Sequence, residues 1–338
     1  MFLSICVISH NQRQQLKRCL DSLLAQKIHF EYEILVSDDA SEDGSFELAQ
    51  EYEQQYSVIH AYRCNTSDFN PTIKSSRSGW NRCNAVQHAT GKYLAFVDGD
   101  DFFLPGKKVY ELQVELLEKN EHCSCYMANC FTLQDGATCD SAELRHIDMF
   151  ETGEVISAAW YLQNTFRESH CFVYRRVEGV NLKNEIGGYL VDNTITAFHL
   201  QFGDIVCLKD AGYVYVQYKS SVWNDYKKNN DYLIVGCPAL FNTGLFPKLK
   251  PIYWQGYIHI CLLLGLADAA RKHLPMSEAV IEWTKCFGYY TPQTFLKPLT
   301  ATDKIHLFVL YALLKAMKSM KRHYPQMPMP WRLLDKLL

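Results

Sequence analysis

Short apolar runs alternate with amphipathic stretches through the first hundred residues. Each run is rich in apolar and β-branched side chains and is too short for a helix, so it predicts a buried strand. Each amphipathic stretch places apolar residues at helical spacing and predicts a helix. This alternation predicts an α/β fold with a mostly parallel sheet and right-handed crossovers. Strands are expected at residues 2–9, 33–37, 58–62 and 93–97, and helices after residue 11 and at residues 46–55 and 81–89.

Polar and glycine residues suggest where some of these elements end. Asn11 is expected to cap the first helix, because a side-chain oxygen there can accept from the first turn. Gly91 is expected to end the third helix. Further along, residues 205–208 and 213–218 predict a hairpin around a turn at residues 210–212.

The pattern changes in the last third of the chain. From residue 224 onward, prolines separate longer helical patterns, so we expect an α/β domain at residues 1–223 and a helical C-terminal region at residues 224–338. Residues 304–323 form a basic amphipathic helix pattern, and residues 331–338 add tryptophan and leucines. Such a tail suits peripheral contact with an anionic membrane, packing on the α/β domain, or a homodimer interface, and the sequence leaves these alternatives open.

Composition narrows the class of protein. The chain has 338 residues and a formal net charge of -3. Nucleic-acid-binding domains usually carry an excess of positive charge, so no nucleic-acid partner is expected. Its 13 cysteines are odd in number and form no paired Cys-x-x-Cys motifs, which favours buried free thiols over a disulfide framework or a zinc site. We find no basic leader before the first apolar run and no apolar stretch long enough to span a bilayer. A cytoplasmic location is therefore expected, either free or at the inner membrane surface.

Two acidic clusters each follow a predicted strand. Asp38 and Asp39 follow one strand, and Asp98, Asp100 and Asp101 follow another. Ligands of such sheets bind at the carboxyl ends of the strands, where both clusters are expected. Mn²⁺ and Mg²⁺ prefer oxygen ligands and often bridge carboxylates to phosphates. The small Gly99 is expected to let a ligand come close. The sequence therefore predicts a divalent-cation site that serves a diphosphate group.

The same segments, in this order and spacing, resemble family 2 glycosyltransferases of the GT-A fold over residues 2–223. The resemblance implies a Rossmann-like sheet flanked by helices, with a nucleotide-sugar-binding half at residues 1–105 and an acceptor-binding half at residues 106–223. The motifs that carry it are SICVISHN at 4–11, EILVSDDASEDGS at 33–45, NAV at 84–86, GKYLAFVDGDD at 91–101 and GGYLVD at 187–192.

The resemblance also implies a role for each matching residue. Ser9 and Asp39 would lie beside the nucleotide base, with Asp39 accepting a base N–H, as uracil offers. Asp98 would contact the ribose or the metal, and Asp100 would be the principal ligand of Mn²⁺ or Mg²⁺. Asp192 would be the general base of an inverting transfer from a UDP-sugar to a hydroxyl of a lipid-linked or polysaccharide glycan, of the bacterial surface-polysaccharide type.

The chain departs from the family pattern at three places. Valine precedes Asp192 where the family often has glutamate. Arg82 stands one position before the usual arginine, and it or Lys74 could reach a phosphate. A histidine that many members carry near residues 219–221 is missing, and His170 is either a substitute for it as a ligand or acceptor contact or a hydrogen-bonded structural histidine.

These departures keep two alternatives open. The first is a catalytically inactive scaffold that binds a nucleotide sugar. The second is a nucleotidyltransferase on a similar sheet, although the loop His10–Arg13 lacks the glycines that such enzymes need.

Overall fold

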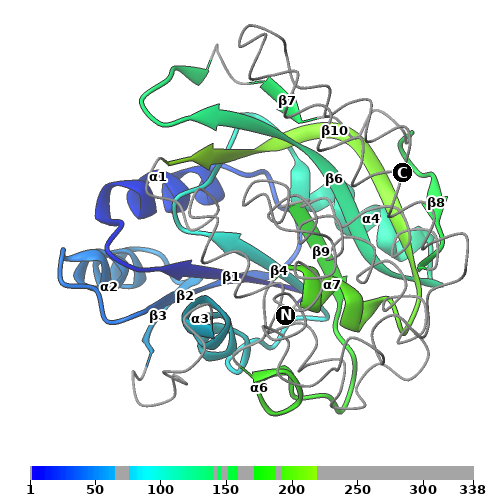
Figure 1. The fold of residues 1–338 in the computed structure, drawn as a ribbon, viewed down its shortest axis with the longest axis horizontal. Helices are drawn as coiled ribbons and strands as arrows, with labels where there is room; N and C mark the ends of the chain where they lie inside the picture. Colours follow the sequence, from blue (N-terminus) through cyan, green and yellow to red (C-terminus); the bar gives the residue numbers. More distant parts are fainter. Residues whose placement is uncertain are drawn as a thin grey trace, which may run out of the picture. The chain divides into compact units, whose positions relative to one another are not determined.

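A mixed sheet forms the centre of the described part of the chain (Figure 1). The computed structural model describes residues 2–64, 76–139, 143–145, 151–158, 171–187 and 192–218. The described strands are β1 Leu3–Ser9, β2 Tyr32–Asp38, β3 Ile59–Arg63, β4 Tyr93–Asp98, β5 Phe102–Phe103, β6 Cys123–Gln134, β7 Glu143–Arg145, β8 Val155–Ile156, β9 Cys171–Arg175 and β10 Asp204–Gln217. The described helices are α1 Arg13–Leu24, α2 Ser45–Gln55, α3 Ser76–Val86, α4 Val109–Lys119, α6 Leu182–Glu185 and α7 Asp192–His199.

The strand order explains how a parallel half and a mixed half form one sheet. The order is β3-β2-β1-β4-β9-β6-β10-β5, with β7 paired to β6 and β8 paired to β10. The first four strands of this order run parallel, β9 is antiparallel to both of its neighbours, and β10 runs parallel to β6. This confirms the predicted α/β class with a mostly parallel sheet flanked by helices.

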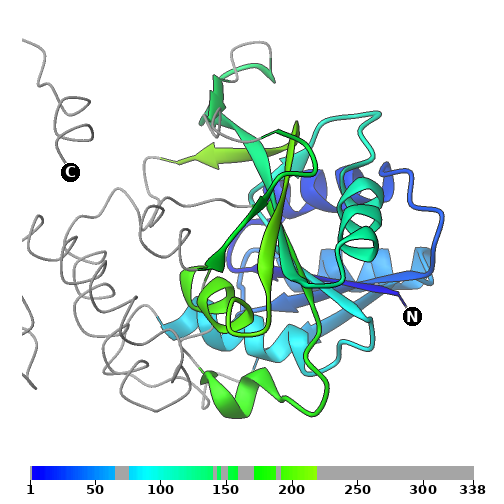
Figure 2. The same cartoon turned by 90° about the vertical axis from the view of Figure 1, so that its right-hand side faces the viewer.

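Helices cover both faces of the sheet. The helices α1, α2 and α4 lie on one face, whereas α3, α6 and α7 lie on the other (Figure 2). Alternate residues of each parallel strand point to the first face, so Leu3, Ile5 and Val7 of β1 join its core. The helices contribute Leu16, Leu20, Leu23, Leu48, Ala49, Val109, Val114 and Leu117 to the same core. None of the helices within the described ranges is long and apolar enough to cross a membrane.

The predicted Asn11 cap of α1 is wrong. The capping residue is Gln12, and its side chain makes no capping hydrogen bond. Asn11 has a φ of 51°, and its side-chain oxygen accepts from the backbone N–H of Glu42. The N–H of Arg13 instead donates to a carboxylate oxygen of Asp43 at 2.9 Å, so the loop after β2 caps the helix that follows β1.

The predicted hairpin at residues 205–218 is also wrong. Residues 205–217 lie in the single strand β10, which pairs in parallel with β6 on both sides of a register shift between Leu208 and Tyr213. A bulge therefore absorbs the expected turn residues without reversing the chain. The backbone passes close to α4 there, since a Cβ on Gly212 would lie 2.2 Å from a methyl carbon of Val109.

The third helix and its glycine differ from expectation as well. Helix α3 begins at Ser76 and ends at Val86, so it starts and ends earlier than the helix predicted at residues 81–89. Gly91 is not its cap. A Cβ at Gly91 would lie 2.6 Å from the backbone nitrogen of Ser4, so glycine is required by the close approach of β1.

The proposed boundary at residue 223, the C-terminal region at residues 224–338, Lys74 and His170 lie outside the described residues. The prediction of buried thiols is confirmed for Cys123, Cys125 and Cys130, which are buried in β6 and form no disulfide there.

Gly91→Ala should lower the free energy of unfolding by about 1–3 kcal/mol, because the new methyl group would overlap backbone atoms that cannot rotate away. Urea unfolding monitored by circular dichroism measures the change. Gln50→Ala, at an exposed position of α2, is the control and should change stability by less than about 0.5 kcal/mol. Equal stability of Gly91→Ala and wild type would contradict the close approach.

Candidate active site

The carboxyl end of β1 brings the two acidic turns to one edge of the sheet. In the parallel pairing, Ser9 lies opposite Asp38 of β2, and Ile8 lies opposite Asp98 of β4. Backbone bonds continue this pairing into the turns. The N–H of Asp39 donates to the Ser9 carbonyl at 2.9 Å, and the N–H of Gly99 donates to the Ile8 carbonyl at 2.8 Å. Both clusters therefore lie where the sequence predicted them.

Gly99 is needed for the approach of its turn to β1, and its expected role in letting a ligand come close stays a prediction. A Cβ on Gly99 would lie 2.7 Å from the Ile8 carbonyl oxygen. The glycine thus lets the acidic turn approach β1.

Two buried polar atoms lie without partners on the β2 side of the site. Ser9 and Asp39 are 2% and 4% exposed. The Ser9 hydroxyl oxygen and Asp39 Oδ1 have no hydrogen-bond partner among the described residues. An unsatisfied buried polar atom costs about 1–3 kcal/mol, so this pair fits a ligand that supplies the missing bonds.

The other oxygen of Asp39 is occupied. Asp39 Oδ2 accepts from Arg77 Nε at 2.9 Å, and the half-exposed ring of His10 bonds the Asp39 carbonyl oxygen at 2.6 Å. Sequence reasoning missed both neighbours. Arg77 precedes the helix predicted at residues 81–89, and the structure has the first turn of α3 there. His10 directly follows Ser9, and this adjacency was the available signal.

Helix α3 holds the ends of β1 and β2 together. Asn81 Nδ2 donates to the Ser9 carbonyl at 3.1 Å, and the Ser37 hydroxyl donates to Asn81 Oδ1 at 2.5 Å. Asn84 Nδ2 donates to the same hydroxyl at 2.8 Å. These buried bonds explain why a polar helix packs on this face, and they fix Ser9 beside Asp39.

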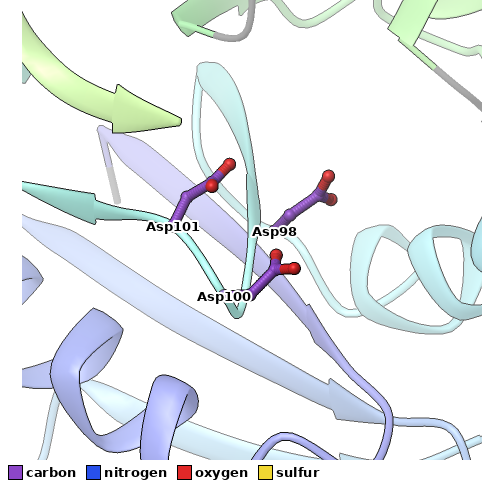
Figure 3. Close-up of side chains that lie close together, drawn as sticks. All are labelled: Asp98, Asp100 and Asp101. Carbon is purple, nitrogen blue, oxygen red and sulfur yellow. The ribbon is translucent and has the colours of Figure 1, made fainter. Parts of the chain in front are cut away.

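Three carboxylates meet after β4. Asp98, Asp100 and Asp101 each place a carboxylate oxygen within 4.8 Å of the other two (Figure 3). Asp101 is fully buried and accepts from the Tyr213 hydroxyl at 2.5 Å and from the Val216 N–H at 2.8 Å. Both of its oxygens are thus bonded to β10. Asp101 anchors the turn, and Asp98 and Asp100 remain as the pair that could hold a cation.

The pair of candidate ligands carries unbalanced negative charge. Burial and the neighbouring Asp98 carboxylate raise the pKa of Asp100 from its ordinary value to about 7. Burial and the Asp100 carboxylate also raise the pKa of Asp101 well above its usual range. A divalent cation would relieve this repulsion, and carboxylate oxygens are the donors that Mn²⁺ and Mg²⁺ prefer. The residues present therefore fit the predicted metal.

Arg82 lies in this site, but its partner is a carboxylate. The side chain is buried, and its Nη2 donates to Asp98 Oδ1 at 2.7 Å. The pairing balances part of the charge on Asp98. The predicted contact of Arg82 with a donor phosphate stays a prediction.

Asp192 is the first residue of α7, and its side chain lies outside the description. Helix α7 packs on β9, and β9 pairs with β4, the strand that ends at Asp98. The segment before α7 is tied to α3, because the Cys83 thiol donates to the Gly187 carbonyl at 3.0 Å. The predicted catalytic role of Asp192 stays a prediction.

A comparison with known families decides the class of protein. Residues 4–177 match the family described as Glycosyl transferase family 2, which is more than half of the chain. The chain belongs to this family. The two acidic turns fall inside the matched region.

Relatives and solved structures agree with this family. An uncharacterized protein of Mycobacterium tuberculosis is 26% identical over 227 residues, which is 66% of this chain and 60% of that protein. A poly(ribitol-phosphate) beta-glucosyltransferase of Bacillus spizizenii is 34% identical over 103 residues, which is 30% of this chain and 15% of that protein. The chain thus spans less than two thirds of the length of either relative.

Staphylococcus aureus TarS 1-349 shares the fold, with a TM-score of 0.58 at 16% identity, covering 97% of this chain and 93% of that chain. The same TarS fragment in complex with UDP superposes with a TM-score of 0.57 at 15% identity, over the same shares of the two chains.

Without metal, the protein should lose stability as the pH rises from 5 to 8. The folded state keeps a proton on Asp100 up to about pH 7, whereas an exposed aspartate loses it near pH 4, so deprotonation favours unfolding in this window. Asp100→Asn cannot ionise and should lose less stability over the same range, by about 1–2 kcal/mol. Urea unfolding in EDTA at each pH measures both proteins. Parallel pH profiles would contradict a raised pKa at Asp100.

Proposed function

We propose that this glycosyltransferase moves a sugar from a UDP-sugar to an acceptor hydroxyl, with inversion at the anomeric carbon. The observation that supports this most is that each side of β1 lacks an interaction that a nucleotide sugar and its metal ion would supply. On one side, Ser9 and Asp39 keep buried atoms that lack hydrogen-bond partners among the described residues. On the other, Asp98 and Asp100 carry close negative charge that Arg82 balances only in part.

The spacing of the two sides suits an extended nucleotide. Neighbouring strands lie about 4.8 Å apart, so the ends of β2 and β4, which flank β1, are separated by roughly 10 Å. This supports a donor that crosses the end of β1, with its base at Asp39 and its diphosphate near Asp100. Uracil offers a ring N–H for Asp39 Oδ1 to accept. That TarS was crystallised with UDP supports the same choice of base.

A divalent cation, Mn²⁺ or Mg²⁺, would be held by Asp98 and Asp100. When bound, such an ion neutralises charge on the departing diphosphate. Asp101 would not join it, because both of its oxygens are bonded to β10. Arg82 supports the site by holding Asp98 in place and is close enough to the turn to contribute positive charge toward the donor phosphates.

Asp192 would act as the general base. An acceptor hydroxyl is a weak nucleophile until a positioned carboxylate removes its proton. The oxygen then forms a bond to the anomeric carbon on the face opposite the nucleotide, and the bond from that carbon to the diphosphate oxygen breaks. The proton passes to Asp192, and the UDP leaves with the bonding electrons.

The acceptor is proposed to be a lipid-linked or polysaccharide glycan in the cytoplasm, at the inner face of a membrane. The Bacillus spizizenii relative acts, by its name, on a poly(ribitol-phosphate) polymer, which supports a polymeric acceptor class. Residues 224–338, with their basic amphipathic pattern, are the proposed segment for peripheral membrane contact or a homodimer.

Asp192→Asn should reduce transfer or slow hydrolysis of a UDP-sugar by at least about 100-fold, which is the lower range for loss of a general base. Its affinity for UDP with Mn²⁺ should stay within twofold of wild type, measured by calorimetry. Glu185→Gln, an exposed acid on the preceding helix α6, is the matched control and should keep full activity. Unreduced turnover in Asp192→Asn would reject this residue as the base. A scaffold that only binds would show no turnover in any of the three proteins.

Asp39→Asn should weaken UDP binding by about 10–100-fold, because the amide can leave an N–H facing the base N–H in a buried pocket. Calorimetry with UDP and Mn²⁺ measures the loss, and Glu42→Gln, an exposed acid three residues away in the same loop, is the control. Equal UDP affinity for Asp39→Asn and wild type would place the base elsewhere.

A further inference from the structure

One arginine side chain connects three segments around the metal-binding turn. Arg18 lies on α1, and its guanidinium carbon is 4.4 Å from the centre of the Phe102 ring. Its Nη2 donates to the Asp100 carbonyl oxygen at 2.7 Å and to the Tyr218 hydroxyl at 3.1 Å. The guanidinium group of Arg18 is thus held by the turn at Asp100, by Phe102 of β5, and by Tyr218, the residue after β10.

These contacts act on the backbone of the turn and leave its carboxylates free for a ligand. The turn is closed by a bond from the Asp101 N–H to the Asp98 carbonyl at 3.0 Å, and Asp101 is anchored on β10. The Arg18 bond fixes the peptide between Asp100 and Asp101. The direction of the Asp100 side chain depends on the orientation of this peptide.

We propose that Arg18 is a positioning residue that holds Asp100 in the conformation that binds the divalent cation, with Tyr218 as its second support. The proposal rests on the metal role of Asp100 in the proposed function. A planar guanidinium suits this place, because it can stack on an aromatic ring while it donates in its own plane. Lysine offers a point charge and cannot reproduce both contacts.

Positioning and simple electrostatics predict opposite results for this residue. Removing a positive charge near a cation site should strengthen Mn²⁺ binding if charge alone matters. Removing the bond that orients Asp100 should weaken Mn²⁺ binding if position matters. The sign of the change therefore separates the two effects.

The test is a titration of free Mn²⁺ by electron paramagnetic resonance in the presence of saturating UDP, with the full-length protein. Arg18→Met should raise the Mn²⁺ dissociation constant about tenfold, and Arg18→Lys should raise it by a smaller factor. Tyr218→Phe should raise it about twofold to threefold. The Mn²⁺ concentration for half-maximal UDP-sugar hydrolysis should shift in parallel, while kcat at saturating Mn²⁺ changes less than about twofold.

Lys17→Met is the matched control, because Lys17 is the neighbouring cation on α1 and pairs with Asp21 on the exposed side of that helix. It should leave Mn²⁺ binding unchanged. Melting curves confirm folding, and if Arg18→Met does not fold, Arg18→Lys and Tyr218→Phe decide the question. An unchanged or tighter Mn²⁺ affinity in the folded Arg18 variants would overturn the positioning role. A wild-type protein that binds no Mn²⁺ with UDP would instead reject the proposed function itself.

Discussion

The hydrogen-bond ladder between β1 and its two parallel neighbours sets the geometry of the site. It holds the ends of β2 and β4 on opposite sides of Ser9, and it extends into both acidic turns through the N–H groups of Asp39 and Gly99. Because the ladder is buried and continuous, these positions do not depend on any ligand. The two acidic turns, which we propose to bind the base and the metal, are thus held at a fixed separation by backbone pairing alone.

The three carboxylates after β4 differ in their partners and therefore in their roles. Asp101 is satisfied by β10 and secures the turn, and Asp98 is partly balanced by Arg82. Asp100 is left close to Asp98 in a buried place, which raises its pKa to about 7. Keeping two such groups together costs stability unless a cation binds between them. This cost is expected where a site is built for a ligand that supplies the missing charge.

Much of the parallel half of the sheet could be predicted from the sequence. Hydrophobic periodicity located β1, β2, β3 and β4, and the rule that ligands bind at carboxyl ends of strands brought Asp39 and Asp98 together. Predictions based on neighbouring residues failed where the deciding contact is made by a residue distant in the sequence. The carboxylate that accepts from the first turn of α1 belongs to Asp43, and the apparent turn in β10 is a bulge that pairs with β6 on both sides.

The arginines of the site show the same limit. Nothing in the local sequence indicates that Arg18 meets Tyr218, 200 positions away, or that Arg77 pairs with Asp39. Such pairings follow from how the layers pack, and periodicity cannot reveal them. The base assignment of Asp192 rests on the family pattern, and the structure contributes the start of α7 at that residue.

A crystal structure with UDP and Mn²⁺, with anomalous scattering collected at the manganese edge, tests the central claim most directly. We predict one anomalous peak within coordination distance of Asp98 and Asp100. We also predict a uracil ring beside the Ser9 hydroxyl whose N–H donates a hydrogen bond to Asp39 Oδ1. A peak bound by Asp101, or a base that leaves Ser9 and Asp39 without partners, would contradict it.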